Sequence, residues 1–187
     1  MLITVAMDKD AEAAKRWIEA AQPTHPSLID SQHLVADLYN MVNVPTVVWI
    51  DEDGRIVRPN DVAFGTDTFK AMTGIESLKH QDALRSWVRG EATAPTDETV
   101  RSLQTLPSPQ DQEARAEFAL AFWLFNQGRL DAAEKHFVLG GDLAPHDFMI
   151  RRGSMPIRGI DSMGPAFAKM TADWQAAGNS YYLQLPD

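Results

Sequence analysis

The sequence contains no cysteine. A chain without cysteine forms no disulfide, offers no thiolate to a metal ion and supplies no thiol for redox chemistry. It also has no run approaching the roughly 20 apolar residues that a membrane-spanning helix needs. Basic residues are in the minority, since 17 Lys and Arg stand against 26 Asp and Glu, for a net charge of −9. An acidic surface repels phosphate backbones, so we expect neither a nucleic-acid nor a membrane partner.

Sequence motifs for common enzyme chemistry are also missing. There is no Gly-x-Ser-x-Gly elbow and no phosphate-binding glycine loop. Asp51, Asp53 and Gly54 resemble a calcium loop, but Val62 stands where the loop needs a glutamate, which favours a hairpin turn. The five histidines lack zinc-ligand spacing; they are His25, His33, His80, His136 and His146. We therefore expect no metal, no cofactor and no catalytic residue in this chain.

What is present is an ordinary globular composition, with 44% hydrophobic and 23% charged residues in 187. Met1–Asp8 has no basic region or cleavage site typical of a signal peptide, so we expect a cytoplasmic protein. Arg151, Arg152 and Arg158 lie close together in the sequence. They are either an anion or carboxylate contact or a solvated helix end, and the second interpretation is favoured.

The stretch VADLYNMVNVPTVVWIDEDGRIVRP, residues 35–59, carries the strongest local signals. Apolar spacing at its start predicts a helix, which Pro45 and its preceding residues end. Thr46–Ile50 is a β-branched and aromatic run typical of a buried strand. Asp51–Gly54 predicts a tight turn, and Arg55–Arg58 the paired strand.

The residues before this stretch predict alternating strands and helices. Leu2–Met7 is apolar and short, as a buried strand is. Asp10–Ala21 has helical apolar spacing, and Asp8 or Asp10 is its expected cap. Pro26–Asp30 is extended, and Ser31 is the expected cap of the helix that runs to about Met41. The first part of the chain is therefore expected to be α/β.

This succession resembles the second half of a thioredoxin-like domain, especially the TlpA/ResA type of thiol-disulfide oxidoreductase. The resemblance implies an α/β fold, a thioredoxin-like sheet with flanking helices. It implies a cis peptide bond before Pro45 and a substrate-binding loop at Val44, Pro45 and Thr46. In that family the main chain at the Val44 position pairs with an extended substrate peptide. The alternative is a trans proline that simply opens a strand.

The family's strand and helix that carry two cysteines have no counterpart in the sequence. That strand is the central one of the sheet, so its neighbours, Leu2–Met7 and Thr46–Ile50, would have unpaired edges. Three outcomes are open: these strands pair with each other in one sheet, another chain supplies the strand in a homo-oligomer or complex, or the sequence is the downstream part of a longer protein. We favour the last, and we predict that both segments are strands of one sheet.

The remaining residues predict helices. A short helix is expected from Thr66 or Asp67 to Gly74, and a longer one at Ser77–Val88 with Leu78, Leu84, Trp87 and Val88 inward. We divide the chain into a thioredoxin-like domain at 1–90, a linker at 91–112 with a short helix after Thr96, and a small all-α domain at 113–187.

The helical domain opens at Ser108-Pro109, a cap followed by a favoured first helical residue. Its first helix is apolar almost all round, which predicts burial on several sides. A second helix follows Gly128 and ends before Pro145. The pattern of small residues, with Phe137, resembles a single tetratricopeptide-type helix pair, which needs neighbours to cover its apolar face.

Two functions are compatible with these features. The first is a thioredoxin-like oxidoreductase that is redox-inactive because it lacks its cysteines. The second is a non-catalytic protein-interaction module, made from a thioredoxin-like scaffold and a tetratricopeptide-type helix pair. Both imply a protein or peptide partner.

Overall fold

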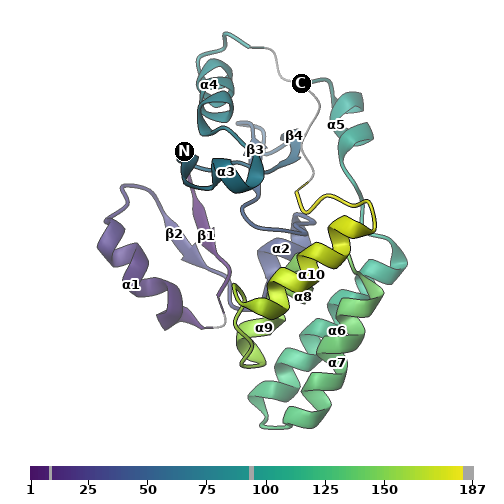
Figure 1. Cartoon of the computed structure of the whole chain (residues 1–187). Coiled ribbons are helices and arrows are strands. Elements are labelled where there is room, and N and C mark those ends of the chain that lie inside the picture. Colours follow the sequence, from purple (N-terminus) through teal and green to yellow (C-terminus); the bar gives the residue numbers. More distant parts are fainter. Residues whose placement is uncertain (9, 93–94, 183–187) are drawn as a thin grey trace. The chain divides into compact units, whose positions relative to one another are not determined.

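The computed structural model describes residues 1–8, 10–92 and 95–182. Helices and strands are mixed along the chain (Figure 1). Contacts divide the chain into two compact units, each made of two stretches of the sequence. The first unit is Met1–Val42 with Pro107–Asp173, and the second is Asn43–Leu106 with Trp174–Asp187.

The first unit begins with a small parallel sheet. Strands β1 (Thr4–Ala6) and β2 (Ser27–Ile29) are parallel neighbours, joined by helix α1 (Ala11–Ala21). The predicted acidic cap is confirmed, because the Asp10 carboxylate accepts a hydrogen bond from the Ala13 N–H. Figure 1 shows the two arrows side by side and α1 next to β2.

Helix α2 is shorter than the sequence predicts, spanning only Leu34–Leu38. The prediction of Ser31 as its cap is wrong. The Asp30 carboxylate instead accepts hydrogen bonds from the N–H groups of Leu34 and Val35, at 3.0 and 2.6 Å. The helix ends early because Asn40 takes a positive φ of 49°.

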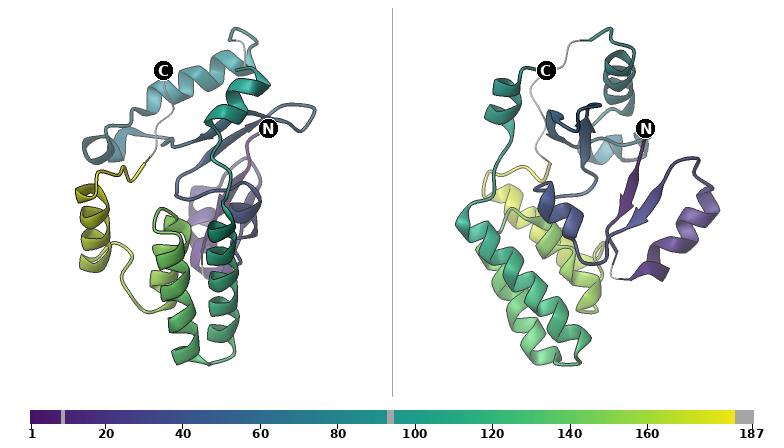
Figure 2. Two further views of the ribbon diagram at one scale, coloured as in Figure 1. Left: turned by 90° about the vertical axis from the view of Figure 1, so that its right-hand side faces the viewer. Right: turned by 180° about the vertical axis from the view of Figure 1, so that it is seen from behind.

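An antiparallel helix pair forms the core of the first unit. It consists of α6 (Pro109–Asn126) and α7 (Leu130–Leu143), joined at Gly128, whose φ of 73° favours glycine. Both views in Figure 2 show the two helices side by side. The predicted cap at Ser108 and Pro109 is confirmed, and it forms a capping box with Asp111.

The helix pair is buried along one seam. Its core consists of small and aromatic residues from both helices and of residues from the segment after α7: Ala114, Phe118, Ala121, Leu124, Ala133, Phe137, Ala144, Ile150 and Ile157. The prediction that α6 is buried on several sides is wrong, because Leu120 and Trp123 are exposed. Short helices α8 (Phe148–Arg151) and α9 (Ser154–Ile157) cover one side of the pair.

Helix α10 (Pro165–Ala176) comes next along the chain, and its last turn belongs to the second unit. The second unit contains the predicted hairpin. Strand β3 (Val47–Ile50) pairs antiparallel with β4 (Ile56–Asp61). The turn forms because the Asp51 carboxylate accepts hydrogen bonds from the N–H groups of Asp53 and Arg55, and Gly54 has a φ of 79°.

Helices complete the second unit. The short helix predicted to end at Gly74 consists of η1 (Asp67–Phe69) and α3 (Lys70–Thr73). Helix α4 spans Ser77–Val88 as predicted. Helix α5 (Asp97–Leu103) confirms the short helix expected after Thr96, and it packs on β4.

The predicted single sheet is wrong. Among the described residues, β1 pairs only with β2, and β3 pairs only with β4, so the chain has two separate two-stranded sheets. Local connections decide this pairing, because α1 returns the chain beside β1 and a tight turn returns it beside β3. No strand in the part of the chain that the structure describes joins the two sheets.

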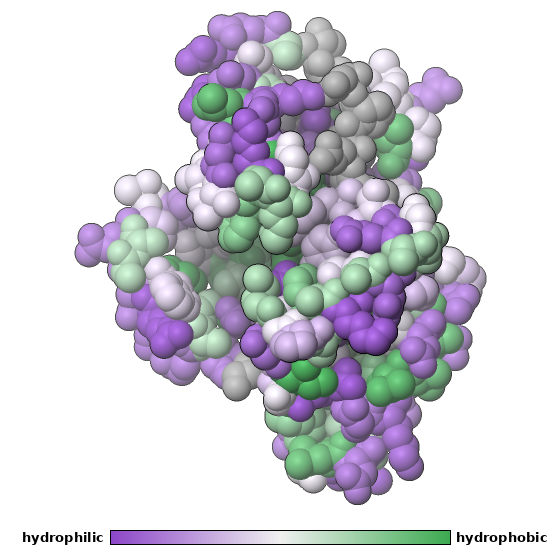
Figure 3. All heavy atoms as spheres, in the orientation of Figure 1, coloured by the Kyte–Doolittle hydropathy of each residue, from purple (hydrophilic) through white to green (hydrophobic). Residues whose placement is uncertain are grey.

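Several apolar residues that were expected inside are at the surface. In α4, Leu78 and Val88 are exposed, so the prediction that they face inward is wrong. Figure 3 shows hydrophobic residues, in green, at the surface among hydrophilic ones. Among the described residues, no helix is both long enough and apolar enough to cross a bilayer.

Candidate functional site

The predicted substrate-binding loop lies at the start of β3, in the second unit. Its peptide bond between Val44 and Pro45 is cis, as predicted. Asn43 at the start of the loop is buried, while Val44, Pro45 and Thr46 are half-buried.

Two side chains of the loop shape its backbone. The Asn43 carboxamide oxygen accepts a hydrogen bond from the Val44 N–H at 2.8 Å. The Thr46 hydroxyl donates to the Asn43 carbonyl at 2.5 Å. The Val44 N–H is therefore used within the loop. Two other polar groups of the loop are the Val44 carbonyl, an acceptor, and the Asn43 side-chain amide, a donor.

Both of these groups contact a segment near the end of the chain. The Tyr182 hydroxyl donates a hydrogen bond to the Val44 carbonyl at 3.2 Å. The Asn43 amide donates to the Tyr181 main-chain carbonyl at 2.8 Å. Sequence reasoning missed Asn43, Tyr181 and Tyr182. The available signal was compositional, since two of the chain's three tyrosines are adjacent near its end.

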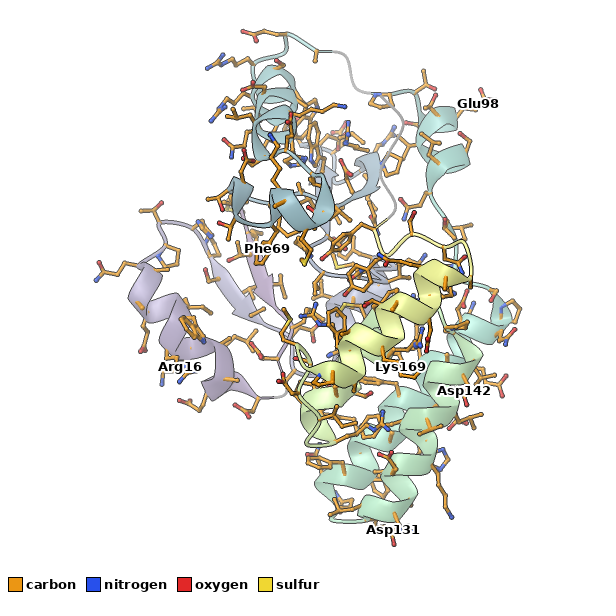
Figure 4. All side chains as sticks on the ribbon, viewed as in Figure 1. Arg16, Phe69, Glu98, Asp131, Asp142 and Lys169 are labelled. Carbon is orange, nitrogen blue, oxygen red and sulfur yellow. The ribbon has the colours of Figure 1, made fainter. Side chains whose placement is uncertain are left out.

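Aromatic rings surround this contact. Tyr182 meets Phe64 edge to face, with ring centroids 6.0 Å apart, and lies against Tyr181 at 4.6 Å. Phe64 in turn lies 5.3 Å from Phe69, which Figure 4 labels at η1. Such pairs add to the free energy of burial when their geometry is edge to face. The loop therefore has a polar contact bordered by aromatic side chains.

The segment that meets the loop is itself ordered by short-range bonds. The Trp174 indole N–H donates to the Ser180 carbonyl at 3.0 Å, and the Asn179 N–H donates to the Trp174 carbonyl at 3.2 Å. Gly178 turns the chain with a φ of 83°, a conformation that favours glycine. This turn directs Tyr181 and Tyr182 to the loop.

A second polar and aromatic cluster of the same unit surrounds Trp49 in β3. Trp49 is buried and stacks on Trp87 at 5.1 Å, and the Arg58 guanidinium lies 5.1 Å from its ring centroid. Trp49 and Arg58 line a small cavity of about 100 Å³, and most of its other lining residues are apolar. A larger groove of about 320 Å³ is lined by Arg55, Ile56, Asp97, Val100 and Arg101.

Asp61 at the end of β4 is a charged neighbour of this cluster. Its carboxylate lies 3.0 Å from the Arg58 guanidinium and 3.9 Å from the His80 ring. Burial by itself raises the pKa of Asp61, but hydrogen bonds from His80 and Arg58 outweigh it and lower that pKa below its usual value.

In the first unit, ionisable groups gather where α2 meets the helix pair. Arg115 of α6 lies 3.5 Å from the Asp37 carboxylate and 3.9 Å from that of Asp147. Asp147 is almost fully buried, which raises its pKa to about 6 despite the Ile150 N–H bond and Arg115. Burial also lowers the pKa of His33, whose ring lies 4.8 Å from that of Phe118. These groups join elements within the unit.

The three clustered arginines bind groups of their own chain. Arg158 forms two hydrogen bonds with the Glu134 carboxylate, at 2.7 and 2.6 Å. Arg151 donates to the Pro145 carbonyl at 2.6 Å, and Arg152 to the Ser162 carbonyl at 3.2 Å. The Arg158 contact is the carboxylate contact that was the less favoured interpretation, so for Arg158 the favoured solvated helix end is wrong.

No group of three or more metal-binding side chains occurs among residues 1–8, 10–92 and 95–182. Comparison of the chain with family models, with curated proteins and with solved structures finds no match. We therefore infer function from the geometry of the loop at residues 43–46.

Proposed function

We propose that this chain is a non-catalytic peptide-binding module, in which the loop at Asn43, Val44, Pro45 and Thr46 binds an extended polypeptide segment. The observation that carries the proposal is the pair of hydrogen bonds between this loop and the main chain and side chain of Tyr181 and Tyr182. A loop that binds one peptide segment through a backbone carbonyl and an amide has the groups to bind another.

The scaffold in this proposal is thioredoxin-like, of the TlpA/ResA type. The order of elements supports it, because a parallel β1–α1–β2 unit is followed by α2, the loop and an antiparallel hairpin. The chain contains no cysteine, so it has no thiol chemistry of its own. The helix pair α6 and α7 is the tetratricopeptide-like part of the module.

The test is binding of an unfolded polypeptide. A reduced and carboxymethylated protein, labelled with a fluorophore, is titrated with the full chain and followed by anisotropy. We expect saturable binding that Asn43→Ala weakens by about tenfold, since it removes the donor and loosens the loop. Asn126→Ala, an exposed asparagine of the helix pair, is the matched control and should bind like the parent.

Two results would contradict the proposal. One is no binding of the unfolded protein at any accessible concentration, and the other is equal affinity for Asn43→Ala and Asn126→Ala. A parallel insulin-reduction assay with dithiothreitol distinguishes the redox alternative. We expect the chain to give the same rate as buffer, because no thiol is present to carry the exchange.

A further inference from the structure

We infer that the segment Trp174–Tyr182 is an intramolecular ligand of the loop at residues 43–46, and that it must leave the loop before a separate peptide binds there. The inference rests on the proposed function of the loop. It adds a regulatory contact and a class of partner, an uncharged peptide that contains tyrosine.

The contact uses one donor and one acceptor of the loop. The donor of the loop, the Asn43 amide, meets the Tyr181 main-chain carbonyl. Its acceptor, the Val44 carbonyl, meets the Tyr182 hydroxyl. An incoming peptide that uses the same groups therefore competes with the segment directly.

Contacts within the segment fix its conformation independently of the loop. The Trp174 indole holds the Ser180 carbonyl, and Gly178 supplies the turn between them. Preorganisation reduces the conformational entropy that is lost on docking. Because the segment is covalently attached, its effective concentration at the loop is in the millimolar range, as for short linkers. The two hydrogen bonds to the loop and the edge-to-face contact with Phe64 are among the contacts that hold the segment there.

The composition of the segment indicates what the loop accepts. The residues from Gly178 to Tyr182 are GNSYY, which carry no charge. Tyr182 combines a hydroxyl donor for Val44 with a ring that meets Phe64 edge to face, 6.0 Å away. A partner can reproduce both hydrogen bonds if it has a tyrosine for the Val44 carbonyl and, in the residue before it, a main-chain carbonyl for the Asn43 amide. We therefore expect the partner to contain a tyrosine in an extended segment.

The experiment adds the segment back as a separate molecule. The probe is a fluorescein-labelled peptide of residues 174–182, WQAAGNSYY, titrated with the full chain. In Tyr182→Phe the attached segment loses its bond to Val44, and competition weakens. We expect this variant to bind the probe about fivefold more tightly than the parent, the equivalent of about 1 kcal/mol for one hydrogen bond. Tyr39→Phe, which removes a hydroxyl in the first unit, should bind the probe like the parent.

A second probe and a second readout test the same contact. A probe with phenylalanine at its last position should bind Tyr182→Phe about fivefold more weakly than WQAAGNSYY does. Backbone amide signals of Val44 and Thr46 in a ¹⁵N-labelled full chain should shift in Tyr182→Phe and stay in place in Tyr39→Phe. This spectrum also shows whether each variant is folded.

The outcomes separate the inference from the proposed function. Equal probe affinity for the parent and Tyr182→Phe, with unchanged Val44 and Thr46 signals, would overturn the intramolecular ligand while the loop remains a peptide site. Failure of every variant to bind either the probe or the carboxymethylated protein would overturn the proposed function, and the inference with it.

Discussion

The helix pair and the strand pairs of this chain differ in how they bury their apolar residues. In α6 and α7, Ala114 and Ala121 are fully buried and Phe137 is 2% exposed. In the strands, Leu28 of β2 is 51% exposed and Ile50 of β3 is 41% exposed. The helix pair thus forms its core from residues that are near in sequence, whereas the strands leave apolar side chains at the surface.

The difference in burial follows from how many packed helices or strands cover the apolar face of each region. Two antiparallel helices bury a seam against each other, and α8 and α9 add Ile150 and Ile157 to it. A two-stranded sheet has two faces and buries a face only where a helix covers it, so alone it is marginally stable. We therefore expect the largest losses of stability from substitutions in the helix pair, and the smallest from the exposed residues of the second unit.

The largest effect should come from Phe137→Ala. Phe137 is a central residue of the helix-pair core, and its truncation leaves a cavity that the surrounding residues cannot fill. We expect a loss of about 3–5 kcal/mol in the free energy of unfolding, measured by urea denaturation with circular dichroism. Val138→Ala, a neighbour that is 43% exposed, is the control and should lose less than about 1 kcal/mol. Similar losses for both would contradict the assignment of the core.

Asp147 and Asp61 should give the two units opposite dependence on pH. The folded-state pKa of Asp147 is raised from 3.8 to about 6. Its contribution to the free energy of unfolding is therefore fully present below pH 3.8 and is lost as the pH rises through about 6. Asp147→Asn removes this loss and keeps an acceptor for the Ile150 N–H. Relative to the parent, this variant should gain about 3 kcal/mol in unfolding free energy between pH 3.5 and pH 7.

For Asp61 the sign is reversed. The folded-state pKa of Asp61 is lowered. Its contribution to the free energy of unfolding is therefore present at pH values above the unfolded-state pKa, and it is lost as the pH falls through the folded-state pKa. Asp61→Asn should therefore lose stability relative to the parent at neutral pH, and the difference should shrink on acidification. Urea denaturation at a series of pH values measures both variants. Parallel pH profiles for the two variants would refute the contrast.

A smaller effect is expected from two adjacent glycines of α7. A Cβ at Gly140 would lie 2.9 Å from the Ala114 carbonyl oxygen, which is backbone of α6. Gly140→Ala should therefore separate the helices at a cost of about 1–3 kcal/mol. At Gly141 the nearest atom is the Arg151 Cγ at 3.4 Å, in a side chain that can move. Gly141→Ala should be neutral or stabilise by up to about 1 kcal/mol through helix propensity. Thermal melting compares the pair, and equal losses would exclude close packing at Gly140 as the cause.

The smallest effect should come from Leu78→Ser in α4. Leu78 is 62% exposed, so the substitution should change the unfolding free energy by no more than about 0.5 kcal/mol. Ile75→Ser, at a buried position just before α4, is the control and should give a clear loss. A loss of more than about 1.5 kcal/mol in Leu78→Ser would mean that this face of α4 is covered in solution, for example in an oligomer. Sedimentation velocity would then show whether a second copy covers it.

Local features of the fold were predictable because neighbouring residues produce them. The cap at Asp10, the capping residues Ser108 and Pro109, and the turn at Asp51–Gly54 each depend on side chains within a few positions. Helix α4 also has the predicted limits. The start of α2 was not predicted correctly: the N-cap residue is His33, with a positive φ of 59°, and this backbone turn brings the Asp30 carboxylate to the N–H groups of Leu34 and Val35.

At the candidate site, the peptide bond before Pro45 is cis as expected. The assignment of Val44, Pro45 and Thr46 to substrate binding stays a prediction. The contact with Tyr182 was not predictable, because it joins residues that are far apart in sequence and no periodicity connects them.

By itself, the sequence determined the absence of thiol chemistry, the order of strands and helices as far as α7, and the turns at Gly54 and Gly128. Each depends on residue type or on short-range geometry. Only the tertiary structure decided which strands pair, that Leu78 and Val88 are exposed, that Asp147 is buried beside Arg115, and that Tyr181 and Tyr182 occupy the loop at residues 43–46. These features depend on contacts between residues that are distant in sequence. Alternative contacts compete in free energy, and no local sequence pattern shows which of them forms.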